Sequence, residues 1–311
     1  MHFSTNIPDF DEAAAALWAY QRSENAHIKR FCELLGNDAQ TFIPIRGFKD
    51  FAMKDGDWEA EAIFESSGTT GQIPSRHEVR DLAIYQKAAL EGFFHFYPKQ
   101  QYRILALLPH YLERGSSSLV QMVKMWTDEF GLPGSGFYLY NFEALQQSLA
   151  EAAGAREPIL LIGVAYALLD FVEQFPIALP PDSIVMETGG MKGRKEEITR
   201  DELHQQLKQG LGVSQISSEY GMTELLSQFY AKESGRFFAP PWARAIISDL
   251  HLPDVPVAEG SSGRINIIDL ANVHSCAFIA TDDLGRQHPD GSFEVLGRID
   301  NSELRGCSLM Y

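Results

Sequence analysis

The chain has 311 residues, 45% of them hydrophobic, and carries a formal net charge of −16 at pH 7. The hydrophobic content excludes extensive disorder, and the acidic balance argues against binding to nucleic acid or an anionic membrane, because those partners need clustered lysine and arginine. This length allows two domains or one large domain of several layers.

The cysteines and the N-terminal segment indicate the compartment. Cys32, Cys276 and Cys307 are scattered along the chain, which is typical of a reducing compartment rather than a disulfide framework. The sequence has no apolar run of the roughly 18 residues that a membrane span requires. Residues 1–11 lack the basic and apolar segments of a secretory signal. We therefore expect a cytoplasmic globular protein with no membrane span, and the size favours an enzyme.

In chain order, the first two thirds of the sequence predict several helices. Asp9 or Asp11 is expected to cap a helix that continues to Leu35, and an irregular connection is expected over residues 42–51. Further helices are predicted over residues 78–97, 116–130 and 165–175, and a last one is capped by Thr199 and ended by Gly212.

Short apolar runs between these helices predict strands over residues 103–108, 159–164, 183–187 and 215–218. Strands that alternate with helices favour largely parallel sheets. After residue 240 the pattern changes to strands joined by turns, over residues 243–248, 264–269, 276–280 and 292–296. The sequence therefore predicts an α/β body over residues 1–240 and a β-rich subdomain over residues 241–300.

One segment has the composition of a phosphate-binding loop. Four hydroxyl residues and two glycines follow a short apolar run, namely Ser66, Ser67, Gly68, Thr69, Thr70 and Gly71. Glycine permits positive φ and close backbone approach, and hydroxyls with exposed amides can wrap a polyphosphate. No Gly-Lys-Ser/Thr follows, so the loop is not a Walker A motif. Composition alone favours a polar surface turn.

The order of these residues resembles the phosphate loop of the adenylate-forming superfamily, whose members convert acids to acyl-AMP. Three later segments resemble further motifs of that superfamily in the same order: Tyr220-Gly221-Met222-Thr223-Glu224, Thr281-Asp282-Asp283-Leu284-Gly285 and Gly297-Arg298-Ile299-Asp300. Taken singly, the first is also typical of a helix start, the second of a β-turn, and the third carries no weight. Because all four keep the family order over residues 66–306, the chain is identified as a member of the superfamily.

The resemblance implies roles for the matched residues. Residues 66–71 would hold the β- and γ-phosphates of ATP, and Thr223 would contact the α-phosphate. Glu224 would bind Mg²⁺, which suits a hard carboxylate. Thr223, Glu224 and Arg298 are thus the expected catalytic residues.

The adenosine and acyl contacts follow from the same resemblance. Adenine would lie against Tyr220, Gly221, Gly189 and Gly190, and Asp283 would accept hydrogen bonds from the ribose. Arg298 would contact the ribose or a phosphate. His110 is expected to border the acyl pocket. Cys307 is a candidate acyl acceptor, although an ordinary small apolar residue is the favoured alternative.

The chain also departs from the family pattern. Ser75 stands where the family commonly has a lysine after the phosphate loop, with Arg76 as a candidate substitute charge. Asp282 replaces the glycine that usually precedes the ribose-binding aspartate. These changes motivate an alternative function, a degenerate protein that binds nucleotide or acyl-adenylate without turnover.

Four segments resemble the acyl-protein synthetases of bacterial bioluminescence, with phenylacetate-CoA ligases as the next group; they cover residues 42–49, 64–71, 75–77 and 187–194. The implied fold is α/β, the large N-terminal domain of the superfamily, with stacked α/β sheets and a β-rich subdomain. Residues 301–311 would be the hinge and the start of a small C-terminal domain that is otherwise absent from the sequence.

The implied reaction has two steps. ATP, with Mg²⁺, would activate a carboxylic acid, fatty or aryl, to acyl-AMP with release of pyrophosphate. The acyl group would then pass to a thiol. That thiol would belong to CoA, to the phosphopantetheine of an acyl carrier protein, or to a cysteine of an acyl-acceptor protein.

Overall fold

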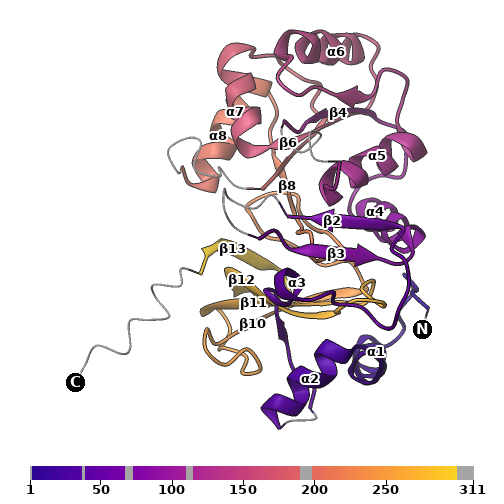
Figure 1. Ribbon diagram of the computed structural model, residues 1–311. Coiled ribbons are helices and arrows are strands. Elements are labelled where there is room, and N and C mark those ends of the chain that lie inside the picture. Colours follow the sequence, from indigo (N-terminus) through magenta and orange to yellow (C-terminus); the bar gives the residue numbers. More distant parts are fainter. Residues whose placement is uncertain (1, 37–38, 67–72, 110–114, 190–197, 300–311) are drawn as a thin grey trace. The chain divides into compact units, whose positions relative to one another are not determined.

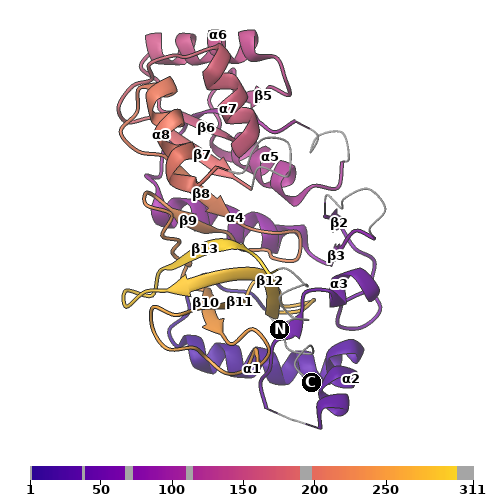
Figure 2. The same cartoon turned by 90° about the vertical axis from the view of Figure 1, so that its left-hand side faces the viewer.

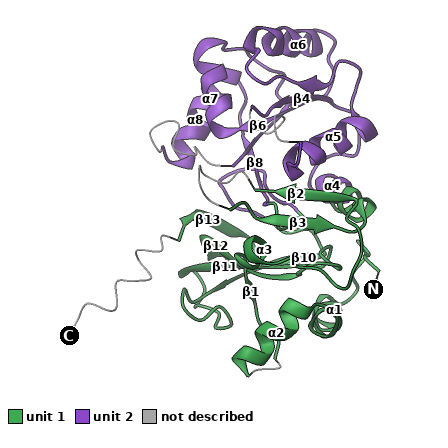
Figure 3. Cartoon of the chain, viewed as in Figure 1, with its two compact units in different colours: residues 1–88, 223–227, 238–311 green, residues 89–222, 228–237 purple. Residues whose placement is uncertain are grey.

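The computed structural model describes residues 2–36, 39–66, 73–109, 115–189 and 198–299 (Figure 1). The chain divides into two compact units that interleave along the sequence (Figure 3). Unit 1 contains residues 1–88, 223–227 and 238–311, and unit 2 contains residues 89–222 and 228–237. This division differs from the boundary expected at residue 240, because residues 43–44 near the N-terminus pair with residues 279–280 near the C-terminus.

Unit 2 is built on a six-stranded sheet with the order β5-β4-β6-β7-β8-β9. Its parallel strands are β4 (Arg103–Leu107), β5 (Gly136–Phe137), β6 (Ile159–Val164), β7 (Ile184–Thr188) and β8 (Ser217–Tyr220). The last strand, β9 (Phe229–Ala231), is antiparallel to β8. Every residue of β6 is buried, as expected for a central strand covered on both faces. The predicted parallel sheet is confirmed.

Helices flank this sheet. They are α5 (Ser118–Phe130), α6 (Phe142–Gly154), α7 (Ala165–Gln174), α8 (Arg200–Leu211) and the second half of α4 (Leu82–Phe96). Figures 1 and 2 show α7 and α8 on one side of the strands and α5 on the other. The helix α8 begins and ends as predicted, with a capping box between Thr199 and Glu202 and a left-handed Gly212. Within the described ranges, no helix is long and apolar enough to cross a membrane.

Unit 1 contains the β-rich sheet predicted for the end of the chain. Its order is β1-β12-β11-β10, with β13 paired to β12. The strands are β1 (Ile43–Pro44), β10 (Ala243–Ser248), β11 (Ser262–Asp269), β12 (Phe278–Gln287) and β13 (Phe293–Arg298). Residues 281–285 therefore lie within β12, so the β-turn interpretation of this motif is wrong. A separate hairpin joins β2 (Ala62–Glu65) to β3 (Arg76–Val79).

Two helix predictions in unit 1 are corrected by the structure. The single helix expected to end at Leu35 is two helices, α1 (Phe10–Glu24) and α2 (Ala26–Leu35), because Asn25 adopts an extended conformation. The Asn25 side chain caps α2 and also donates to the carbonyl of Ser275. The helix expected from residue 78 begins at Leu82, since residues 78 and 79 pair with β2. The irregular connection over residues 42–51 contains β1 and a short helix, α3 (Gly47–Asp50).

Candidate functional site

The β2–β3 hairpin carries the predicted phosphate loop. At its base, the Ser66 amide donates to the Ser75 carbonyl at 3.1 Å, and the Ser75 amide donates to the Ser66 hydroxyl at 2.9 Å. The remaining predicted loop residues, Ser67, Gly68, Thr69, Thr70 and Gly71, lie outside the described residues. The described part of the hairpin therefore fixes where the loop leaves β2 and enters β3.

Alternate residues of β3 face opposite directions, as in any strand. The exposed Arg76 guanidinium lies 3.5 Å from the Glu65 carboxylate, which offsets its charge. On the other face, Ser75 and His77 are buried. Arg76, the candidate substitute for the loop lysine, is therefore on the opposite face of the strand from Ser75.

His77 contacts the predicted Thr-Glu segment. Its Nδ1 donates to the Thr223 carbonyl at 2.9 Å, and its Nε2 lies 2.9 Å from the Ser275 hydroxyl. Burial lowers the pKa of His77 to about 4, so the ring is neutral near pH 7. Because the Thr223 carbonyl can only accept, Nδ1 carries the proton and Nε2 accepts from Ser275.

The backbone of the Thr223–Ser227 segment is held at several points within unit 1. Asn272 Nδ2 donates to the Glu224 carbonyl at 2.8 Å. The buried Asp269 carboxylate accepts from the amides of Leu226 and Ser227, at 2.9 and 3.0 Å, and from the Ser227 hydroxyl at 2.6 Å. Burial raises the pKa of Asp269, and these donors oppose the rise.

Glu224 is the buried carboxyl of this segment. Burial raises its pKa, whereas a hydrogen bond from the Ser75 hydroxyl and the positive charges of Arg298 and Lys49 favour the ionised form. Among the described residues, no group of three or more His, Cys, Asp or Glu side chains is placed to hold a metal ion. A single carboxylate suits Mg²⁺ that arrives already bound to nucleotide phosphates, because Mg²⁺ usually takes one or two protein carboxylates and substrate oxygens.

Asp283 and Arg298 are directly opposite on β12 and β13. Arg298 Nε lies 3.3 Å from Asp283 Oδ1; the arginine side chain is 83% exposed, and that of the aspartate is 12% exposed. The neighbouring Asp282 faces Arg264 instead, at 3.5 Å. Unit 1 thus brings together Ser66, Ser75 and the Thr-Glu segment at one place, and Asp283 with Arg298 at the sheet edge.

The predicted adenine contacts belong to unit 2. Gly189 follows β7 with φ of +67°, a left-handed conformation that favours glycine, and Tyr220 ends the adjacent β8. The Tyr220 ring lies 6.0 Å from Phe229 and 5.8 Å from Phe237. A Cβ at Gly221 would lie only 2.5 Å from Glu219 Oε1, which explains a glycine there. Gly190 lies outside the described residues.

Two buried glutamates at this strand edge had no predicted role. Glu187 Oε1 lies 3.6 Å from Arg200 Nε and 3.5 Å from His204 Nε2. The neighbouring Glu219 accepts from the Thr188 hydroxyl, and burial raises its pKa to about 7. A sequence offers no signal for these two carboxyls, because Glu187 meets its partners on α8 and Glu219 meets Thr188 only through the pairing of β7 with β8.

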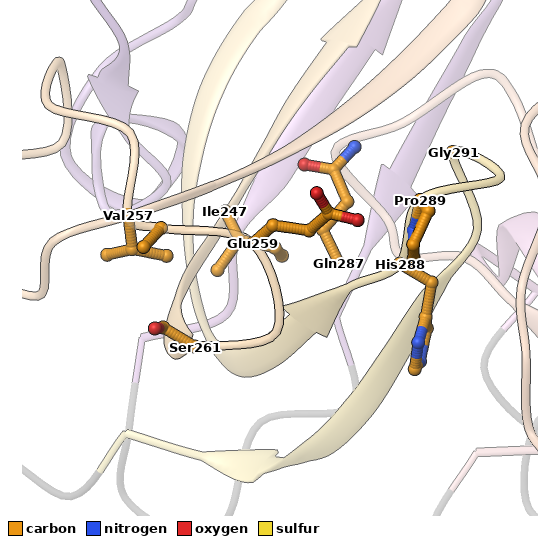
Figure 4. Close-up of a pocket in the computed structure, with 9 residues that line it drawn as sticks. Ile247, Val257, Glu259, Ser261, Gln287, His288, Pro289 and Gly291 are labelled. Carbon is orange, nitrogen blue, oxygen red and sulfur yellow. The ribbon is translucent and has the colours of Figure 1, made fainter.

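Two further candidates, His110 and Cys307, lie outside the described residues. Cys276 is buried, and burial raises its thiol pKa to about 12, which leaves it protonated and unreactive. A cavity of about 300 Å³ in unit 1 is lined by Glu259, Gln287 and other described residues that do not include any predicted site residue (Figure 4).

Comparisons with known proteins identify the family and the fold. The profile of the family described as acyl-protein synthetase, LuxE, matches residues 136–311. The long-chain-fatty-acid–luciferin-component ligase of Aliivibrio fischeri is 26% identical over 188 residues, which are 54% of this chain and 49% of the relative. This chain therefore spans about half the length of the curated relative it matches.

Solved structures share the fold. A 2-hydroxyisobutyryl-CoA ligase in the postadenylation state, in complex with R3-HIB-AMP, aligns with a TM-score of 0.65 and 10% identity over 96% of this chain and 74% of that one. ATP-bound MatB from Rhodopseudomonas palustris aligns with a TM-score of 0.53 and 18% identity over 80% of this chain and 50% of that one. At these identities the likeness concerns the fold alone, and the predicted fold class, the large domain of adenylate-forming ligases, is confirmed.

Proposed function

The chain belongs to the acyl-protein synthetase (LuxE) family, and from this premise we propose that it activates a carboxylic acid with ATP and transfers the acyl group to a thiol. The name of the Aliivibrio fischeri relative specifies a long-chain fatty acid, and a fatty acid is the substrate we propose here. The observation that carries the proposal is Glu224, a buried carboxyl near the Ser75 hydroxyl at the base of the phosphate-loop hairpin.

In the first step, a carboxylate oxygen of the acid attacks the α-phosphorus of ATP. The bond from this phosphorus to the bridging oxygen of the β-phosphate breaks, and pyrophosphate leaves. Residues 66–71 would hold the β- and γ-phosphates, and the Thr223 hydroxyl would donate to the α-phosphate. Positioning and charge stabilisation of this kind supply most of the rate enhancement in phosphoryl chemistry.

Mg²⁺ would neutralise phosphate charge in this step, and Glu224 is the residue proposed to hold it. The burial of Glu224 supports the role, because a charged carboxylate away from water gains more from a cation than an exposed one. The nearby positive charges of Lys49 and Arg298 favour its ionised form.

Adenosine would contact residues of the matched motifs. Tyr220, Gly221, Gly189 and Gly190 are proposed to contact adenine, and Asp283 is proposed to accept hydrogen bonds from the ribose hydroxyls. The Asp283–Arg298 ion pair supports the last role, because it holds an acceptor and a donor at the edge of β12 and β13. Arg298 would contact the ribose or a phosphate.

In the second step, a thiol sulfur attacks the acyl carbonyl, and AMP leaves. CoA, the phosphopantetheine of an acyl carrier protein and a cysteine of an acyl-acceptor protein are the proposed thiols. Cys307 remains a candidate acceptor within this chain, and His110 a candidate border of the acyl pocket. The buried, protonated Cys276 is disfavoured.

A second candidate function is nucleotide or acyl-adenylate binding without turnover. The observation that favours it is Ser75, a neutral residue at the position where the superfamily commonly has a lysine. Asp282, in place of a glycine, also favours this alternative.

Exchange of radiolabelled pyrophosphate into ATP tests the proposal against this alternative. Each member of a panel of fatty and aryl acids is added with ATP and Mg²⁺, and one class of acid is expected to support exchange. ATP binding is measured in parallel by calorimetry. A folded protein that binds ATP but gives no exchange with any acid would favour the binding protein over the enzyme.

A further inference from the structure

We propose that Ser75 and His77 are positioning residues that fix the Thr223–Glu224 segment for nucleotide and metal binding. On this view Ser75, a neutral residue, occupies the position of the usual loop lysine, between the base of the loop and Glu224. The inference rests on the proposed function, because it concerns the segment to which that function assigns the α-phosphate and Mg²⁺ contacts.

The direction of β3 places both side chains on one face. The pairing of Phe64 with His77 and of Glu65 with Arg76 sets the register. Ser75 is 2% exposed and His77 is 1% exposed, whereas Arg76 between them is exposed. Both inward residues reach the Thr223–Glu224 segment, which belongs to the same unit.

Both ring nitrogens of His77 form hydrogen bonds. Nδ1 donates to the Thr223 carbonyl, and Nε2 accepts from the Ser275 hydroxyl, each at 2.9 Å. The Ser275 carbonyl in turn accepts from Asn25 Nδ2 at 3.1 Å. The Phe48 ring meets the imidazole edge-on, with centroids 5.2 Å apart. These contacts allow one ring orientation and one tautomer, and so determine where the Thr223 carbonyl lies.

Ser75 lies between the loop base and the glutamate. Its backbone exchanges hydrogen bonds with Ser66, and its buried hydroxyl lies near the Glu224 carboxylate, whose ionised form it favours. A hydroxyl occupies one lone pair of the carboxylate and leaves the negative charge in place for a divalent cation. An ammonium group in the same buried position would neutralise that charge.

The segment has other supports, so its folding does not depend on β3 alone. Asn272 holds the Glu224 carbonyl, and Asp269 holds the amides of Leu226 and Ser227. We therefore expect variants of Ser75 and His77 to stay folded while the Thr223–Glu224 segment gains freedom. Residues that orient a metal ligand in this way typically change metal affinity about 10- to 100-fold when replaced.

The test measures Mn²⁺ binding in the presence of ATP by electron paramagnetic resonance, which requires no turnover. In Ser75→Ala and His77→Leu, the dissociation constant for Mn²⁺ is expected to rise about tenfold or more. His77→Asn keeps a donor near the Nδ1 position and is expected to restore most of the affinity. Glu59→Gln, at an exposed glutamate of the same unit with no proposed role, is the control and should bind as the wild type does.

A second readout separates positioning from folding. Thermal denaturation monitors stability, and the KM for MgATP is expected to rise in parallel with the Mn²⁺ dissociation constant. Lower melting temperatures with unchanged Mn²⁺ binding would overturn the proposal and leave a purely structural role. If His77→Leu does not fold, Ser75→Ala decides by the same criteria, because it removes one hydroxyl and leaves the backbone bonds to Ser66.

The outcomes also separate this inference from the proposed function. A wild-type protein that binds Mn²⁺ with ATP but exchanges no pyrophosphate contradicts the enzyme, and the variants still test positioning. A wild-type protein that binds no Mn²⁺ with ATP contradicts both.

Discussion

Two clusters of buried polar residues, one in each unit, are partnered in different ways. In unit 1, the Thr223–Ser227 segment is held by neutral donors from His77 and Asn272, and Asp269 accepts from two of its amides. In unit 2, the adjacent strands β7 and β8 instead carry two buried carboxyls on opposite faces of the sheet: Glu187 lies beside Arg200 and His204, and Glu219 accepts from the Thr188 hydroxyl. The first cluster matches buried acceptors with donors, whereas in the second cluster burial raises the pKa of Glu219.

The difference predicts which cluster responds to pH. His77 has a pKa of about 4, so its hydrogen bonds stay the same throughout the neutral range. Glu219 has a pKa of about 7, so it changes charge within that range. We infer that the contact from His77 to the Thr223 carbonyl keeps a constant geometry through the neutral range, and that Glu219 contributes a pH dependence of stability within that range.

The largest expected effect concerns the chemistry at the first cluster. Glu224→Gln keeps the shape of the side chain but removes the charge proposed to hold Mg²⁺. Pyrophosphate exchange is expected to fall about 10²- to 10³-fold, as when other preorganised electrostatic groups are removed. Glu59→Gln, at an exposed glutamate of unit 1, serves as the control. Exchange that falls by less than about threefold in Glu224→Gln would assign the metal contact elsewhere.

The second prediction concerns the stability of the same cluster. Asp269→Ala leaves the amides of Leu226 and Ser227 buried without their acceptor, and the free energy of unfolding is expected to drop by about 4 kcal/mol. Urea denaturation measures the change. Asp249→Ala is the matched control, because the Asp249 carboxylate also accepts two backbone amides but has no buried side chain. Its expected loss is about 1 kcal/mol or less. Equal losses in the free energy of unfolding at the two sites would show that the burial of Asp269 does not cause the larger effect expected there.

The third prediction concerns the second cluster. The folded state raises the pKa of Glu219 from 4.5 to about 7, so it binds the proton more tightly than the unfolded chain does. The associated stability is complete below pH 4.5 and is lost as the pH rises from 4.5 through 7, by roughly 3 kcal/mol. Glu219→Gln cannot ionise and should flatten this part of the stability–pH profile.

Chemical denaturation at several pH values between 4 and 8.5 measures this effect. Glu129→Gln, at an exposed glutamate of α5 in the same unit, should retain the wild-type profile. A Glu219→Gln profile as steep as that of the wild type would mean that another group carries the dependence.

The two clusters also show what a sequence alone can predict. Elements determined by local signals were predicted correctly, such as α8 between Thr199 and Gly212. The break at Asn25 was missed because that side chain donates to Ser275, 250 residues away. Local apolar spacing gives no signal for such a contact.

The candidate site likewise contains residues that the sequence predicted and contacts that it did not. The order of motifs predicted roles for Thr223, Glu224, Asp283 and Arg298, because each motif is continuous in the chain. The contact of His77 with Thr223 was not predicted, because the two residues are 146 positions apart. Glu219 lies directly before the Tyr220 motif, but its shifted pKa results from burial and from the strand pairing, which the motif does not encode.

The smallest expected effect concerns a charge pair outside both clusters. Because the Arg298 side chain is 83% exposed, its ion pair with Asp283 should contribute less than about 1 kcal/mol to the free energy of unfolding. In Arg298→Ala the KM for ATP is nevertheless expected to rise about five- to tenfold, because a charge-assisted hydrogen bond to the nucleotide is lost. Arg286→Ala is the control, since Arg286, whose side chain is 41% exposed, pairs with Glu294 across the same two strands. A matching rise in KM for both variants would point to the general charge of this sheet rather than to a contact made by Arg298.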